Sequence, residues 1–245
     1  LTLETVLDRK SGAFKELWNN IGDYSKTLLS KNKLEINYEI SIPKSASINL
    51  NNKFGDVYIH ERDKKVDITI SHGNLRSNNF NATSNISVSY GDARIKHIKA
   101  GKIQFKSCNA NILSLGDVEI QSSSSEITIK KADELEIDSR SDKSIDIDEA
   151  GRVNGKMIFS KLRIEALNKD LDLGMSYSDI SIDLVPFSFS FVRIDGKSSD
   201  IDIEFGANSY IEMKIEGDDD DLELPPIGLD RELIDEKKGK VRYSG

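Results

Sequence analysis

A six-residue motif recurs ten times along the chain and constrains its fold more than any other feature. In most copies a small or turn-forming residue precedes an apolar, polar, apolar triplet, whose period of 2 is that of a β-strand. The intervals between the second residues of successive copies are 18, 18, 17, 17, 18, 17, 18, 21 and 21. Those second residues are Gly55, Gly73, Gly91, Cys108, Ser125, Lys143, Ser160, Ser178, Ser199 and Asp220.

A second series of short strand patterns lies between the copies of the motif. It occupies residues 66–70, 85–88, 102–105, 118–120, 135–137, 171–173, 187–191 and 211–215. Two short strands therefore fill each repeat, which leaves no room for a helical crossover. An antiparallel meander that forms a sandwich or barrel is the competing arrangement. The even interval favours stacked coils, in which equivalent residues lie above one another. We therefore predict an all-β chain, a parallel β-helix (solenoid) over residues 34–224, with coils of 17–21 residues.

The fourth and sixth residues of the motif are expected to point into the core of the coils. β-Branched side chains dominate these positions, and they suit a pleated, packed surface. The set is Val57, Ile59, Leu75, Ala93, Ile95, Ala110, Ile112, Ile127, Ile129, Ile145, Ile147, Leu162, Ile164, Ile180, Ile182, Ile201, Ile203, Leu222 and Leu224. Ser77 is the one polar residue at such a position.

The two ends of a solenoid need covers, because unpaired strand edges recruit other chains. At the N-terminus, within a segment of residues 1–33, residues 13–29 place Phe14, Trp18 and Ile21 on one helical face, which predicts an amphipathic capping helix. A helix lying on a membrane surface is the weaker alternative, because the polar face is mixed in charge and not basic. Pro225 and Pro226 cannot join a central ladder, so residues 225–245 are expected to form a tail or an interrupting loop.

Charge and composition restrict the classes of partner. A net charge of −8 and a pI near 5.1 oppose non-specific binding to nucleic acid or to an anionic membrane. No apolar run is long enough for a transmembrane helix, and the single cysteine cannot form an internal disulfide. The chain begins at Leu1, and we expect it to be a mature fragment from which an upstream export signal has been removed.

The sequence LEINYEISIPKSASINLNNKFGDVYI at residues 34–59, followed by the repeated motif, resembles the auto-transporter-adhesin-like family of bacterial β-helical envelope domains. The resemblance covers residues 34–224 and implies a single-stranded right-handed β-helix in an exported protein. It implies a place in the cell envelope, periplasmic or on the cell surface, and brings no catalytic residues. His72 and Ser107 depart from the aromatic first residue of the motif, and Cys108 and Lys143 depart from the Gly or Ser that follows.

Stacking turns the outward residues of the motif into columns on the surface. The column of fifth residues begins with Tyr58, Arg76, Arg94, Asn111 and Thr128, which we predict as a surface for a glycan or a cell-surface protein. It changes from basic to acidic along the chain. The column of third residues alternates Asp and Asn in its first half, at Asp56, Asn74, Asp92 and Asn109. A structural role is favoured for this second column, because Asp and Asn side chains bond local backbone groups at tight corners.

The remaining patterns predict no catalytic residue, no cofactor and no metal. SIPK at Ser41–Lys44 matches S-x-x-K but lies at a strand end, and GKS at Gly196–Ser198 lacks the first glycine of a phosphate loop. Cys108 is expected to be a buried thiol and not a nucleophile. Asp218–Asp221 are read as a solvated acidic corner, since no calcium-binding repeat accompanies them. His60, His72 and His97 lack the spacing of a metal site.

These observations favour a non-catalytic, exported binding or scaffold module of the adhesin type. A carbohydrate-active β-helix enzyme, either a lyase or a hydrolase, is the alternative by analogy of fold alone. Its cleft would need long loops, whereas most repeats have 17 or 18 residues. A structural partner in an envelope stress system is a third possibility that the sequence does not separate from the first.

Overall fold

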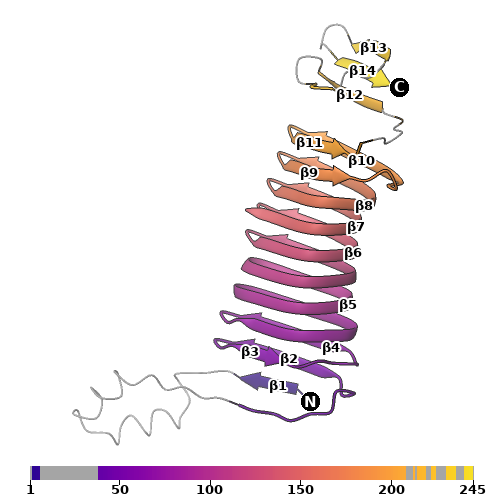
Figure 1. The fold of residues 1–245 in the computed structure, drawn as a ribbon. Helices are drawn as coiled ribbons and strands as arrows, with labels where there is room; N and C mark the ends of the chain where they lie inside the picture. Colours follow the sequence, from indigo (N-terminus) through magenta and orange to yellow (C-terminus); the bar gives the residue numbers. More distant parts are fainter. Residues whose placement is uncertain are drawn as a thin grey trace, which may run out of the picture. The chain divides into compact units, whose positions relative to one another are not determined.

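The computed structural model describes residues 2–5, 38–207, 212, 214–218, 222–224, 230–235 and 240–244. The chain divides into two compact units, Leu1–Glu204 and Phe205–Gly245. The first unit is a parallel β-solenoid of stacked coils, as the repeat predicts (Figure 1). The second contains a three-stranded antiparallel sheet.

The strands of the solenoid follow one another in a single sheet that winds around the core. They are β1 (Thr2–Thr5), β2 (Ile48–Lys53), β3 (Val57–Ile59), β4 (Val66–Ser71), β5 (Leu75–Ser123), β6 (Glu126–Arg140), β7 (Ser144–Ile158), β8 (Lys161–Ser176), β9 (Asp179–Val185), β10 (Phe191–Lys197) and β11 (Asp200–Phe205). β5 alone has 49 residues and continues through several coils, because the chain keeps its ladder bonds as it bends.

Equivalent residues of successive repeats are partners in the parallel ladder. Ile127 lies opposite Ile145, and Ile145 lies opposite Leu162. All three side chains are at most 2% exposed. The predicted stacking of coils and the inward direction of these residues are therefore confirmed.

A left-handed residue begins each coil and turns the chain through the corner. In the described part of the chain, nine non-glycine residues have φ between 50° and 63°, and they recur with the period of the coils: Phe54, His72, Tyr90, Ser107, Ser124, Ser141, Phe159, Tyr177 and Ser198. This conformation costs a non-glycine residue about 1–2 kcal/mol. The corner amides remain in the ladder, as when Phe159 N–H donates to Ser176 C=O at 3.0 Å. The left-handed turn thus changes the direction of the chain without breaking the pairing of coils.

The residue after the corner joins successive coils in one of two ways. In the first coils it is glycine, and a Cβ at Gly73 would lie only 1.9 Å from the carbonyl oxygen of Gly55. In later coils a side chain accepts from the preceding coil's backbone. Ser125 Oγ accepts from Cys108 N–H at 3.1 Å, and Ser178 Oγ accepts from Ser160 N–H at 3.1 Å. Close backbone contact is therefore replaced by a hydrogen-bonded side chain.

The sixth repeat departs from the predicted alignment at its corner. The strands are in the expected register, with Glu126 opposite Ser144, but the left-handed residue is Ser141 and one extra residue follows it. Asp142, and not Lys143, therefore occupies the position of the inward serine. Its carboxylate is 3% exposed and accepts from Ser125 N–H at 2.7 Å. Lys143 points outward and pairs with Glu126 at 2.6 Å.

Two serine hydroxyls complete the environment of the buried Asp142 carboxylate. Ser122 Oγ and Ser139 Oγ each lie 2.5 Å from Asp142 Oδ2. Asp142 N–H in turn donates to Ser160 Oγ at 3.1 Å. Three donors thus satisfy a carboxyl group that would be costly to bury without partners.

The core agrees with the predicted inward set except at the ends of the series. Residues from Ile59 to Ile182 in that set are buried, whereas Val57 is half-buried and Ile201 is 47% exposed. Ile201 lies in β11, the last strand of the path, so no described coil covers it. Ser77 is buried as predicted, and its hydroxyl has no hydrogen-bond partner among the described atoms.

The ends of the solenoid differ from the predicted boundaries. At the N-terminal end, β1 pairs in parallel with β2, and the sequence analysis predicted neither of these strands. The predicted helix at residues 13–29 lies outside the described residues. The strand expected at residues 187–191 begins only at Phe191, because Pro186 and a turn precede β10. β12 (Lys214–Asp218) lies within residues 34–224, the range predicted for the solenoid. It nevertheless pairs antiparallel with β14 (Lys240–Ser244). β14 also pairs with β13 (Asp230–Asp235).

Replacing Ile145 with Asp should prevent stable folding. Ile145 is 1% exposed and stacks between Ile127 and Leu162, so the new carboxylate would be buried without a partner. Thr128→Ala, on the outward side of the same strands, is the matched control and should leave the melting temperature unchanged. Similar melting temperatures for both variants, measured by circular dichroism, would contradict the assignment of inward and outward positions.

Replacing Asp142 with Ala should lower the free energy of unfolding by about 3 kcal/mol, because three buried donors lose their acceptor. The neighbouring Lys143→Ala removes only an exposed ion pair and should cost less than about 1 kcal/mol. Urea unfolding of both variants measures the difference. An equal loss for the two variants would show that the buried carboxylate does not stabilise the corner.

Candidate binding surface

The predicted binding column forms one continuous row on the outside of the solenoid. Tyr58 lies opposite Arg76 in the ladder, and Asn111 lies opposite Thr128. Tyr58, Arg76, Arg94 and Asn111 are exposed, and Thr128 is half-buried. The predicted grouping of these side chains is thus present, and their role in binding stays a prediction.

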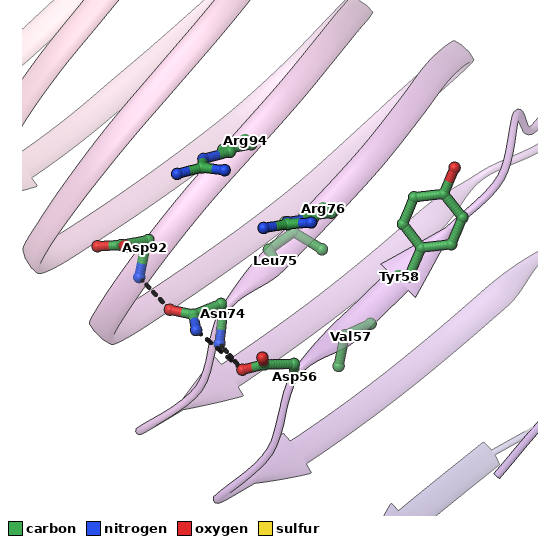
Figure 2. A pocket seen from close by; sticks show the side chains of 8 residues that line it. All are labelled: Asp56, Val57, Tyr58, Asn74, Leu75, Arg76, Asp92 and Arg94. Atoms are coloured by element: carbon green, nitrogen blue, oxygen red, sulfur yellow. Dashed lines mark hydrogen bonds between the residues drawn. The ribbon is translucent and has the colours of Figure 1, made fainter. Parts of the chain in front are cut away.

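The first three coils of this surface enclose a shallow hollow of about 360 Å³, which we call the arginine hollow. Figure 2 shows Arg76 and Arg94 side by side on adjacent coils, with Tyr58 on the coil next to Arg76. The lining residues are Asp56, Val57, Tyr58, Asn74, Leu75, Arg76, Asp92 and Arg94.

Asp and Asn alternate along the edge of the arginine hollow and bond from coil to coil. Asp56 Oδ1 accepts from the Asn74 backbone N–H at 3.1 Å and from Asn74 Nδ2 at 2.9 Å. Asn74 Oδ1 in turn accepts from Asp92 N–H at 2.8 Å (Figure 2). The predicted structural role of this column is therefore present, although the bonds join coils and are not confined to one corner. An amide between two carboxylates also avoids direct repulsion.

The arginines of the hollow differ from those of later coils in their pairing. Arg152 bonds Asp170 at 2.9 Å, Arg163 bonds Asp183, and Arg193 bonds Asp172 at 3.1 Å. Arg76 and Arg94 form no ion pair with any residue that the structure describes. Two guanidinium groups with all their donors available therefore face solvent on one surface.

Exposed rings stack along the left-handed corner next to the hollow. The centroids of Phe54 and His72 are 5.1 Å apart, and those of His72 and Tyr90 are 4.9 Å apart. Phe159 and Tyr177 form a second stack at 5.1 Å. His72, a departure from the aromatic pattern of the motif, thus serves as a ring of the stack. The sequence signal for this feature is the recurrence of rings every 18 residues.

A second hollow lies on the other side of the corner, and the sequence reasoning did not identify it. This polar groove has a volume of about 400 Å³. It is lined by Ser87, Ser89, Gln104, Phe105, Lys106, Gln121, Ser122, Ser123, Asp138 and Arg140. The available signal was the pair Gln104 and Gln121, which are one repeat apart on the second strand of successive coils.

The motifs considered for catalysis are dispersed. Lys44 of SIPK pairs with Glu61 at 2.5 Å, and Ser198 of GKS is a left-handed corner residue. Cys108 is 4% exposed, and its thiol lies 3.1 Å from the carbonyl oxygen of Val88. Burial raises the pKa of this thiol, so the reactive thiolate is disfavoured.

The histidines and the described end of the acidic run have separate local partners. His60 packs edge-on against Tyr58 at 4.7 Å, and His97 Nδ1 lies 3.1 Å from Ser114 Oγ. Asp218 ends β12 opposite Lys240, and the rest of the acidic run lies outside the described residues. Within the described ranges, no three His, Cys, Asp or Glu side chains are grouped as metal ligands would be.

Comparison with known proteins provides no relative: no family model, no curated protein and no solved structure matches the chain. In the parts of the chain that the structure describes, no helix has the length and apolar character needed to cross a membrane.

Stability should fall in acid through the paired carboxylates of the later coils. The hydrogen bond from Arg152 lowers the pKa of Asp170, and that from Arg163 lowers the pKa of Asp183. A pKa that is lower in the folded than in the unfolded state stabilises the fold above the unfolded pKa, and this contribution is lost as the pH falls through the folded value.

Arg152→Gln should therefore reduce the drop in urea midpoint between neutral and acidic pH, because Asp170 loses its main charged partner. Lys99→Gln, which removes an exposed charge that has no ion pair with a described residue, is the control. The same acid-induced drop in the wild type and in Arg152→Gln would show that this pair does not contribute.

Proposed function

We propose that this chain is a non-catalytic binding and scaffold module of the cell envelope, as its resemblance to the adhesin-like family implies. Its ligand binds the column of Tyr58, Arg76, Arg94, Asn111 and Thr128, and an acidic glycan is the preferred class. The observation that carries this proposal is the presence of two unpaired arginines, Arg76 and Arg94, in a shallow hollow.

The chemistry of the hollow supports a ligand that bears carboxylate or sulfate groups. Guanidinium groups bind such anions through two parallel hydrogen bonds. The carboxylate of Asp56 is itself engaged by Asn74, which provides two donors to it. The exposed ring of Tyr58 adds an apolar surface with a polar edge next to Arg76.

The rigidity of the support favours binding by display along a surface. Ladder bonds on both neighbouring coils hold the strand that carries Arg76, so the spacing of the side chains is fixed before a ligand arrives. A ligand with repeated charges could therefore bind several coils at once.

Arg76→Glu combined with Arg94→Glu should abolish retention on an array of acidic glycans. The circular dichroism spectrum should stay unchanged, because both side chains are exposed and unpaired. The control variant combines Lys99→Glu with Lys131→Glu, which makes the same change in net charge at two exposed lysines outside the hollow. This control protein should still be retained on the array. Equal retention of the two double variants would refute the assignment of this surface.

Glycan cleavage is the second candidate function, because Asp56 and Asp92 place two carboxylates in the same hollow. They are two rungs apart, which corresponds to about 10 Å, near the upper limit for a pair of inverting carboxylates. Release of reducing ends from a polysaccharide by the purified protein, lost in Asp92→Asn, would support this function and overturn the non-catalytic proposal.

A further inference from the structure

The polar groove runs across four successive coils on the side of the corner opposite the arginine hollow. Gln121 lies opposite Asp138, and Ser123 lies opposite Arg140, in the ladder between β5 and β6. Gln104 and Lys106 occupy the same two positions one coil earlier, and Ser87 and Ser89 one coil before that. Three steps between four rungs give the groove a length of about 14 Å. An extended chain that lies along the stacking direction would fit this length.

The floor of the groove offers hydrogen-bonding groups of both kinds. Gln104 Nε2 donates to Gln121 Oε1 at 3.1 Å, and Gln121 Nε2 donates to Glu119 Oε1 at 2.8 Å. Each amide nitrogen has a second N–H that these bonds leave available, and Gln104 Oε1 accepts no described bond. The hydroxyls of Ser87, Ser89 and Ser123 beside them add donors and acceptors, whereas Ser122 Oγ donates to the buried Asp142. The lining therefore matches a ligand rich in hydroxyl groups.

The charges of the groove favour an anion. Lys106 and Arg140 form no ion pair with a described residue, and Lys106 lies over the Tyr90 ring at 6.0 Å. Asp138, the acid in the lining, is paired with Lys156 at 3.3 Å. The two free cations are two rungs, or about 10 Å, apart, which suits repeated charges on one chain better than a single small anion.

The groove lacks the stacking surfaces that nucleobases need. Phe105, the aromatic residue in the lining, is only 2% exposed. Binding of single strands relies on exposed rings beneath the bases. An acidic peptide would bring carboxylates for the two cations but only its backbone N–H groups as donors, whereas each residue of an acidic sugar chain also brings hydroxyls that both donate and accept. A sugar chain with carboxylates can hydrogen-bond the floor of the groove through its hydroxyls and pair its carboxylates with the two cations.

We propose that the polar groove is a second binding site, for an acidic oligosaccharide that lies along the coils. Lys106 and Arg140 bind its carboxylates. Its hydroxyls bond Gln104, Gln121 and the serines at positions 87, 89 and 123. This site is independent of the function proposed above, because no residue of the groove lines the arginine hollow.

The test uses the full chain with Arg76→Glu and Arg94→Glu, so that any remaining affinity comes from outside the arginine hollow. Calorimetric titration with polygalacturonate should show binding, and the methyl-esterified polymer, whose carboxylates are capped, should not bind. Adding Lys106→Gln and Arg140→Gln should weaken binding about a hundredfold, since each charge-assisted contact is worth about tenfold. Gln104→Ala with Gln121→Ala should weaken it about tenfold without a change in charge.

Lys99→Gln with Lys131→Gln, in the same background, is the control for charge and should bind as the background does. The polar groove would be refuted as a binding site by any of three results. These are a loss of affinity in this control, unchanged affinity in the groove variants, or no binding by the Arg76→Glu, Arg94→Glu double variant. Tighter binding of polyglutamate or single-stranded DNA than of polygalacturonate would overturn the ligand class. If the wild type and the Arg76→Glu, Arg94→Glu double variant bind polygalacturonate with equal affinity, the arginine hollow is refuted as a binding site. That result would not contradict binding in the polar groove.

Discussion

The parallel ladder between successive coils is the interaction on which the rest of the structure depends. The strands of each coil pair in parallel with those of the next, so the chain must return to the same register after each circuit. The left-handed residue at the corner makes this return possible, and its amide stays in the ladder, as at Ser141 N–H and Ile158 C=O, 2.8 Å apart. Regular coil length, inward columns and outward columns all follow from that register.

The corner also shows how the chain offsets the cost of its backbone conformation. A left-handed non-glycine residue costs about 1–2 kcal/mol, while a stacked aromatic pair contributes about 0.5–1.5 kcal/mol. Stacks such as Phe159 on Tyr177 therefore offset part of this cost where rings are present. At serine corners the inward neighbour contributes instead, through bonds such as that from Ser125 N–H to Asp142. The two solutions coincide at Phe159 and Tyr177, because the residues that follow these rings, Ser160 and Ser178, are themselves joined by a hydrogen bond.

Among the described residues, the arginines on the outside of the two hollows and of the later coils form an unpaired group and a paired group. Arg152 and Arg163 of later coils are neutralised by acids on neighbouring coils, and such pairs hold the surface in one arrangement. Arg76, Arg94 and Arg140 lack such partners among the described residues, and they lie in two hollows on either side of one corner. Unpaired cations on a rigid and otherwise acidic chain are more informative about ligands than the net charge of −8.

The sequence by itself determined the solenoid and the direction of its side chains, because a coil that must stack in register imposes its period on the residues. It predicted the inward position of Ile145 and the shared column of Tyr58 and Arg76. Only the tertiary structure showed that Asp142, and not Lys143, points into the core at the corner of the sixth coil. The sequence could not show this, because the alternation of the flanking strands is the same with or without the extra residue at the corner. The tertiary structure alone showed that β12 leaves the solenoid, because a strand pattern does not specify its partner. The polar groove was likewise decided by the fold, because its residues are one coil apart in sequence and become neighbours only when the coils stack.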